Sequence, residues 1–221
     1  MAISPILTGV LVLAIGLLPG SLQASQDRHT IGNFSAGDLS PWKEKVFKGH
    51  TLYTLKTTEN GTVLHADSQG TASAFYNDIR IDLDKTPCLN WSWQIDHALD
   101  GLVETTKSGD DFAARIYVVV SGGLAFWNTR ALNYVWSGSQ PVGSSWPNAF
   151  TEKSFNVVVQ SGPNKTGQWV HYSRNVRADF LSIMGQEFHS IDGIAIMTDT
   201  DNSSRSATAN FGDIHFSSSC S

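Results

Sequence analysis

One stretch of the chain combines residue types that could bind a polar ligand. Residues 111–120 follow the two-residue period of a β-strand, which places alternate side chains on opposite faces. One face is apolar, and the other carries Asp111, Arg115 and Tyr117. Because arginine presents paired donors to a carboxylate or to vicinal hydroxyl groups, this polar face favours the floor of a binding site. The alternative is an internal ion pair of Arg115 with Asp111 or with an aspartate of a neighbouring strand.

A second predicted strand, over residues 132–136, carries aromatic residues that could stand beside this face. Tyr134 and Trp136 alternate with polar or smaller residues and therefore share one side of the strand. Sugar rings stack on such flat walls through their apolar C–H faces, while amides and carboxylates bind the hydroxyl groups. The alternative is core packing, because aromatic side chains bury large areas and usually serve the interior.

Two carboxylates near a later strand end suit calcium. Asp199 and Asp201 offer oxygen ligands, and Asn202 follows them with an amide oxygen. The EF-hand pattern does not fit, because Ser204 and Asn210 stand where Gly and Glu are expected. The alternative to a calcium site in a sandwich loop is a turn in which these side chains bond to nearby backbone. No other cofactor is expected.

No standard catalytic motif accompanies these residues. The sequence contains no Gly-x-Ser-x-Gly elbow, no His-Glu-x-x-His helix and no Walker loop. Asp110 and Asp111 point to opposite faces of a regular strand, so they do not form an acid–base pair across one substrate. An enzyme on the polar face would use Asp111 as acid or base, with Arg115 tuning its charge.

The elements that would position these residues are short strands separated by turn residues. Asn60-Gly61 predicts a tight hairpin turn between two strands, and residues 176–184 predict one short helix that ends at Gly185. Strands recurring about every 8 to 12 residues favour an all-β sandwich or barrel. The predicted strands cover 53–56, 62–66, 89–95, 109–120, 132–136, 154–160, 168–174, 191–198 and 207–216.

The first 24 residues predict a signal peptide. Residues 6–18 are almost wholly apolar, Pro19-Gly20 breaks any helix, and the small residue Ala24 marks a cleavage site. The apolar run is shorter than the roughly 20 residues of a membrane span. The first six residues carry no Lys or Arg, which departs from the usual signal pattern, and a retained anchor is the alternative. We expect residues 25–221 to form the mature domain, periplasmic or extracellular, with no membrane span after cleavage.

The charge of the chain bears on its possible partners, and its two cysteines bear on its compartment. The formal net charge is -5, and 15 basic residues are scattered among 20 acidic ones. A nucleic-acid binder needs clustered Lys and Arg, so nucleic acid is not an expected partner. Cys88 and Cys220 permit a disulfide in an oxidising compartment, and two unpaired thiols are the alternative.

Four ordered blocks carry a family resemblance. They are GDDFAARIYV at 109–118, ALNYVW at 131–136, RNVRADF at 174–180 and IAIMTDTDN at 194–202. On these blocks the chain resembles a bacterial family of unknown function, numbered 3047, over nearly all of the mature region. The resemblance implies an exported bacterial protein of sandwich type and carries no activity with it. More loosely, Phe34, Trp42 and the closing segment 212–216 are similar to galactose-binding-like jelly rolls.

We therefore expect a single-domain, all-β sandwich of jelly-roll type with one short helix, which binds a polar ligand such as a glycan. The ligand would lie over one sheet face. A carbohydrate-active hydrolase or lyase on the same face is one rival, and a structural or partner-binding envelope protein is another. The sequence leaves the oligomeric state open. The residues of the predicted binding face are Asp111, Arg115, Tyr117, Tyr134 and Trp136.

Overall fold

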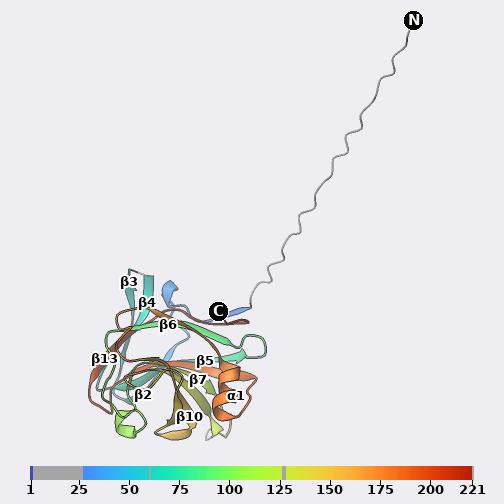
Figure 1. The fold of residues 1–221 in the computed structure, drawn as a ribbon. Helices are drawn as coiled ribbons and strands as arrows, with labels where there is room; N and C mark the ends of the chain where they lie inside the picture. Colours follow the sequence, from blue (N-terminus) through green and yellow to red (C-terminus); the bar gives the residue numbers. More distant parts are fainter. Residues whose placement is uncertain (2–26, 60, 126–127, 221) are drawn as a thin grey trace.

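Two seven-stranded sheets pack face to face in the computed structural model (Figure 1). The structure describes Met1 and residues 27–59, 61–125 and 128–220. The predicted signal peptide lies outside the described residues apart from Met1, and so does Asn60 of the predicted turn. The described chain forms an all-β sandwich of jelly-roll type.

The first sheet has the order β1-β14-β6-β13-β4-β3, and β11 also pairs with β6. The predicted hairpin is present, because Thr58 pairs with Gly61 and the φ of 107° at Gly61 suits glycine. The predicted strand over 207–216 is divided into β13 and β14. The strands are β1 (Arg28–Gly32), β3 (Leu52–Thr58), β4 (Gly61–Gln69), β6 (Cys88–Ile95), β11 (Val170–Asn175), β13 (Ser206–Phe211) and β14 (Ile214–Ser217).

The second sheet has the order β2-β5-β12-β7-β8-β10-β9, so β2 and β9 form its two edges. Strands β8 and β10 run parallel, and the other neighbours in this sheet run antiparallel. The strands are β2 (Lys43–Lys48), β5 (Ala72–Asp82), β7 (Phe112–Val120), β8 (Arg130–Ser137), β9 (Ser145–Asn148), β10 (Thr151–Ser161) and β12 (Ser190–Asp199).

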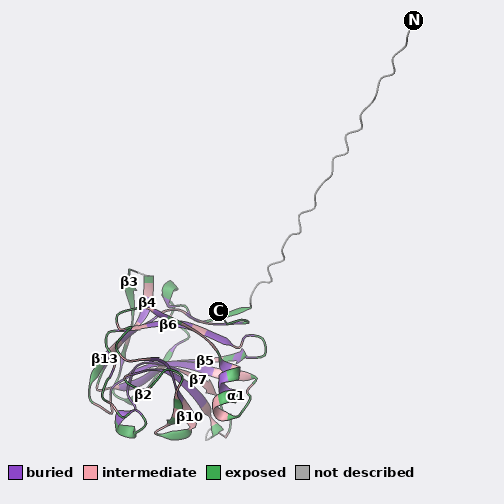
Figure 2. Cartoon of the chain, viewed as in Figure 1, coloured by how far each residue is buried: buried purple, intermediate pink, exposed green. Residues whose placement is uncertain are grey.

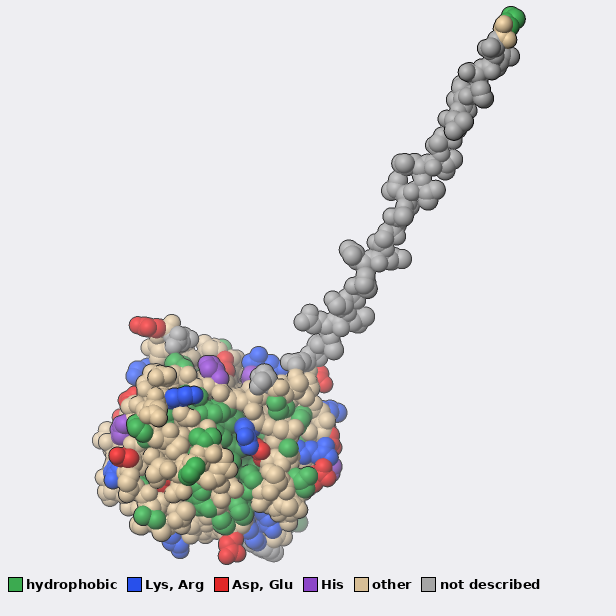
Figure 3. All heavy atoms as spheres, in the orientation of Figure 1, with side chains coloured by type: hydrophobic (Ala, Val, Ile, Leu, Met, Phe, Trp, Pro, Cys, Tyr) green, Lys and Arg blue, Asp and Glu red, His purple; other side chains and the backbone are tan. Residues whose placement is uncertain are grey.

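The hydrophobic core fills the space between the sheets. Alternate residues of β6 project into it, and Trp91 and Trp93 are both buried there. Figure 2 shows buried residues along the facing layers and exposed residues mainly in loops and at sheet edges. On the face seen in Figure 3, hydrophobic side chains gather near the middle, and basic and acidic side chains are interspersed around the edge.

One short α-helix, α1 (Val176–Met184), lies beside the sandwich within the described part of the chain. Its bounds match the predicted helix. Asn175 caps it by accepting a hydrogen bond from the Ala178 N–H, and Gly185 ends it in the left-handed conformation. The described residues also include two short 3₁₀ helices, η1 (Phe34–Ala36) and η2 (Lys107–Gly109). Over the described residues, no helix has the length and apolar character that crossing a membrane requires.

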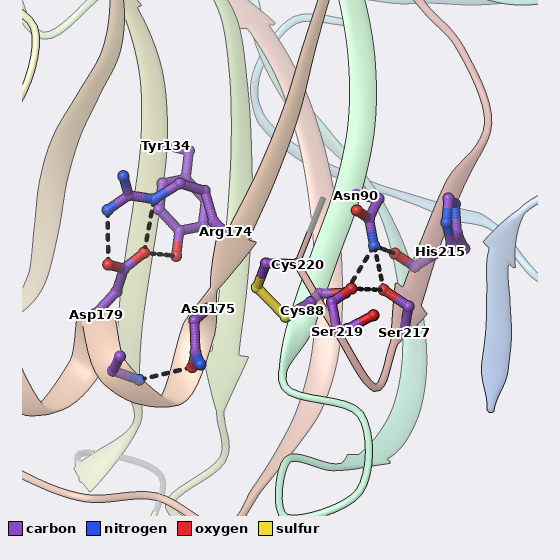
Figure 4. Close-up of a disulfide and its surroundings, with 11 residues drawn as sticks. Cys88, Asn90, Tyr134, Arg174, Asn175, Asp179, His215, Ser217, Ser219 and Cys220 are labelled. Atoms are coloured by element: carbon purple, nitrogen blue, oxygen red, sulfur yellow. Dashed lines mark hydrogen bonds and ion pairs between the residues drawn. A yellow bond between two sulfur atoms is a disulfide. The ribbon is translucent and has the colours of Figure 1, made fainter. Parts of the chain in front are cut away.

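A disulfide joins Cys88 at the start of β6 to Cys220 near the end of the chain (Figure 4). The bond links the segment after β14 to the start of β6. Strand β14 itself pairs with this same end of β6. Next to it, the Asn90 side chain donates to the Cys88 carbonyl and to the Ser217 hydroxyl. The predicted pairing of the two cysteines is therefore confirmed.

We predict that removing this bond lowers stability substantially. The linked cysteines are 132 residues apart. Closing a loop of that size restricts the unfolded chain and contributes up to about 5 kcal/mol in the chain-entropy model. Urea denaturation of the Cys88→Ala/Cys220→Ala double variant should show this loss relative to the oxidised protein. Thiol titration of denatured, unreduced protein should find no reactive thiol, and two reactive thiols would contradict the assignment.

Candidate functional site

A β-bulge in β7 determines which side chains reach the outer face of the second sheet. Arg115 pairs with Met197 of β12, whereas Phe112 pairs with Asp199, so β7 has one extra residue between these pairs. The extra residue places both Ala113 and Ala114 in the core. Phe112 consequently lies on the same outer face as Arg115, and the regular alternation predicted from the sequence fails at this point.

Arg115 is the centre of the polar floor. Its side chain is only 4% exposed, yet it contacts two carboxylates, Asp199 at 3.3 Å and Asp110 at 3.6 Å. It also donates a short hydrogen bond to the Tyr117 hydroxyl, and its guanidinium carbon lies 5.0 Å from the Phe112 ring centre. Burial alone would lower the pKa of Arg115, but the neighbouring charges, chiefly Asp199, raise it. The guanidinium is thus a fixed positive charge.

Asp110 takes the place that the sequence predicted for Asp111. Two amides hold its carboxylate, with Asn148 Nδ2 at 2.8 Å from Oδ2 and Asn156 Nδ2 at 3.1 Å from Oδ1. Asn133 in turn donates to the Asn156 side chain at 2.6 Å. The network joins the start of β7 to β8, β9 and β10, and it fixes the carboxylate that pairs with Arg115.

The structure corrects the role expected for Asp111. Its Oδ1 accepts hydrogen bonds from the backbone N–H and side-chain amide of Asn202, and its Oδ2 accepts one from the Ser203 N–H at 2.6 Å. Among the contacts of the described residues, none joins Asp111 directly to Arg115. Because the bulge reverses the alternation, Asp111 anchors the turn after β12 instead of standing on the binding face.

The predicted metal-binding residues, Asp199 and Asp201, lie together with Asp111. One carboxylate oxygen from each lies within 4.8 Å of the others. Burial raises the pKa of Asp199 well above its ordinary value against the opposing effect of Arg115, and nearby carboxylates raise it further. Burial and the charge of Asp111 likewise raise the pKa of Asp201. These three residues are the ones that could hold a cation, and calcium binding stays a prediction.

A groove with a volume of about 690 Å³ lies over this polar floor. Arg115, Tyr117, Asp110 and Asp199 line its bottom. A second hollow of about 400 Å³ adjoins the groove, and Lys45, Phe47, Tyr117 and Thr129 line both. The two hollows together extend the concave surface along the outer face of the second sheet.

The groove walls come from the two edges of the sheet. Phe47 of β2 stands on one side and is 60% exposed, and Phe150, in the turn between β9 and β10, is 57% exposed. These two rings are the exposed aromatic surfaces that the groove offers to a ligand.

The structure places Tyr134 and Trp136 in the core, which corrects the expectation that they form a stacking platform. They share a strand face as predicted, but that face points between the sheets, and the two residues are 0% and 1% exposed. Tyr134 stacks on Trp91 with ring centres 5.3 Å apart and donates a hydrogen bond to Asp179. Figure 4 shows Asp179 between the Tyr134 hydroxyl and the Arg174 guanidinium.

A family model matches residues 40–215 of the chain, and it describes a protein of unknown function, DUF3047. The chain belongs to the DUF3047 family. No match was found among curated proteins. The matched range contains all of β7, β8, β10 and β12, so the groove floor of this DUF3047 protein lies entirely within the family domain.

Three solved structures illustrate the partial likeness of the fold. A cellulase derived from Cel12A of Rhodothermus marinus has a TM-score of 0.47 and 10% identity, covering 86% of this chain and 100% of its own. Endoglucanase 3 of Trichoderma harzianum has a TM-score of 0.41 and 11% identity, covering 90% and 99%. The xylan-binding module CBM15 has a TM-score of 0.35 and 8% identity, covering 88% and 98%. The fold assignment for this DUF3047 protein rests on its own strand order.

Several groove residues of this DUF3047 protein were not predicted from the sequence. Asp110 was assigned to the wrong face, and Phe47 and Phe150 lie in segments without a recognisable binding pattern. Lys45 stands two residues before Phe47 in the sequence, whereas Lys107 approaches Phe150 only in the folded chain. Of the predicted face, the structure brings Arg115 and Tyr117 to the groove.

We predict that Arg115→Met destabilises the protein by about 3 to 5 kcal/mol, because the substitution leaves a buried carboxylate without its partner. Arg80→Met is the matched control. Arg80 also pairs with an aspartate, Asp192 at 3.1 Å, but its side chain is 75% exposed. Breaking that pair should change stability by at most about 1 kcal/mol. Urea denaturation of both variants measures the difference, and equal losses would contradict a stabilising role for the buried group.

Proposed function

We propose that this DUF3047 protein binds a glycan in the groove on the outer face of its second sheet. The observation that supports the proposal is the combination of a hydrogen-bonding floor with exposed aromatic walls. At the floor, the half-buried Tyr117 is held by the buried Arg115, so Tyr117 is the one of the pair that a ligand can contact. Phe47 and Phe150 stand at opposite edges of the sheet. Sugar rings present apolar C–H faces to aromatic rings and hydroxyl groups to polar side chains, so both kinds of surface would be used at once.

The length of the concave surface favours a chain over a single sugar. The groove and its adjoining hollow share Tyr117 and Phe47 in their linings, so a ligand in the groove could extend into the hollow. Sites that accept chains are extended and open at the ends, whereas sites for small molecules enclose most of their ligand. An oligosaccharide of several units is therefore the proposed ligand.

Burial of the floor carboxylates favours binding over cleavage. Glycoside hydrolysis uses two carboxyl groups that reach the glycosidic bond from opposite sides. Asp110 and Asp199 are each only 2% exposed, and both are directed to the same guanidinium. In this arrangement they stabilise Arg115 and are not free to contact a glycosidic oxygen.

Export would place the protein where glycans of envelopes and matrices occur. The apolar segment before residue 25 and the disulfide between Cys88 and Cys220 support this part of the proposal, because disulfides persist in oxidising compartments. Immunoblotting of periplasmic, medium and cytoplasmic fractions tests it. Protein retained in the cytoplasm at full precursor mass would contradict export.

We predict that Phe150→Ala and Phe47→Ala each weaken glycan binding at least tenfold, or about 1.4 kcal/mol. Both rings are exposed, so the free energy of unfolding should change by less than about 0.5 kcal/mol. A glycan array identifies the ligand, and isothermal titration then compares the variants. Leu181→Ala is the control, because Leu181 is 51% exposed on α1, outside the groove lining. Wild-type affinity in both phenylalanine variants would contradict the proposed walls.

A further inference from the structure

Each wall of the groove pairs an aromatic ring with a lysine. On the β2 side, the Lys45 ammonium lies 5.5 Å from the centre of the Phe47 ring. On the opposite side, the Lys107 ammonium lies 5.5 Å from the centre of the Phe150 ring. The lysines come from β2 and η2, which are far apart in the sequence. The two walls thus present the same chemistry, a flat apolar ring with a positive charge beside it.

A further cation, Arg130 at the start of β8, lines the groove between the walls. Its Nη1 donates to the Asn128 carbonyl at 2.9 Å, which fixes the guanidinium without neutralising it. Within the described part of the chain, the ion pairs involve none of Lys45, Lys107 and Arg130. Three positive charges around the groove therefore lack an acidic partner.

The acidic residues of the groove are already occupied by other groups. Asp110 and Asp199 are buried against Arg115 at the floor. The Asp201 carboxylate accepts a hydrogen bond from the Asn202 side-chain amide at 3.1 Å, and the Lys48 ammonium donates to the Asp201 main-chain carbonyl at 2.7 Å. The positive charges stand at the exposed rim and the negative charges lie below them. The rim is therefore positive although the protein has a net charge of -5.

We propose that the groove selects acidic glycans, namely chains whose sugars carry carboxylate groups. This inference rests on the proposed function and adds the class of ligand. A uronate ring would stack on Phe47 or Phe150 while its carboxylate pairs with the adjacent lysine, and Arg130 would bind a further carboxylate between the walls. Charge-assisted hydrogen bonds of this kind are stronger than those to neutral hydroxyl groups.

The buried carboxylates argue against a general polyanion site. A densely sulfated chain carries more than one charge per sugar, so it would bring a denser run of negative charge over Asp110, Asp199 and Asp201, and like charges in proximity are unfavourable. A uronate chain has one carboxylate per sugar at most and presents hydroxyl groups between them. Its spacing of charge fits a positive rim above a floor that contains carboxylates.

The experiment compares each acidic polymer with its own neutral form. Affinity electrophoresis measures binding to polygalacturonate, alginate and hyaluronan. Each polymer is also tested after its carboxyl groups have been reduced to alcohols. This reduction removes the charge and keeps the sugar backbone. Xylan is a neutral reference, and dextran sulfate and a single-stranded oligonucleotide are polyanion references. We expect at least one uronate polymer to bind at least tenfold more tightly than its reduced form, with affinity falling as salt rises.

Charge variants test whether the rim is responsible. Lys45→Gln/Arg130→Gln should weaken binding of the uronate polymer at least tenfold more than it weakens binding of the reduced form. Lys56→Gln/Lys165→Gln is the control, because it removes the same charge from exposed positions in β3 and in the segment before β11. That variant should bind as the wild-type protein does. Thermal melting of all proteins shows whether each variant is folded.

The outcomes separate this inference from the proposed function. Equal affinity for a uronate polymer and its reduced form would overturn acidic selectivity while leaving glycan binding in place. Equal affinity for dextran sulfate or the oligonucleotide would also overturn it, because binding would then follow charge alone. If neither the acidic nor the neutral polymers bind, the proposed function fails as well. A similar loss in the rim and control variants would assign the effect to net charge and overturn the role of the rim.

Discussion

The burial of Arg115 is the constraint on which the rest of the site depends. A guanidinium with almost no solvent contact must be compensated by carboxylates and by acceptors for its hydrogen bonds, or the fold loses several kcal/mol (on the order of 3 to 5). The bulge in β7 supplies the compensating charge, because it brings Asp110 to the Arg115 face, where β12 supplies Asp199. Asn148 and Asn156 then hold Asp110. The floor of the groove is thus built around one positive charge.

Inside the sandwich, a smaller network likewise supplies partners to a buried polar group. Tyr134 is buried among aromatic rings, so its hydroxyl requires a partner in a region that excludes water. Asp179 of α1 accepts from that hydroxyl, and Arg174 binds the same carboxylate at 2.6 and 2.9 Å. The helix is therefore fixed to the sandwich by the hydrogen bond that one core tyrosine requires.

How far the sequence predicts this molecule depends on whether a feature is local. The helix bounds, the Asn175 cap and the hairpin at Gly61 follow from residues adjacent in the chain, and they are confirmed. The sandwich follows from the spacing of strands. The sequence does not predict that Asp110 rather than Asp111 lies on the groove face. The reason is that the bulge is created by pairing with β12, and it shifts the faces of β7 by one residue. Alternation likewise groups Tyr134 with Trp136 but does not say which face of their strand is inside.

The floor and the walls of the groove differ in what they do for the fold. Floor residues such as Arg115 are buried in a network that spans five strands, so a substitution there affects stability before it affects recognition. The wall residues Phe47 and Phe150 are exposed at opposite edges of the sheet and contribute little to the core. Because the lysines beside them are equally exposed, ring and charge can change without unfolding the protein. Ligand selectivity can therefore reside in the edge strands while the network beneath keeps the groove in shape.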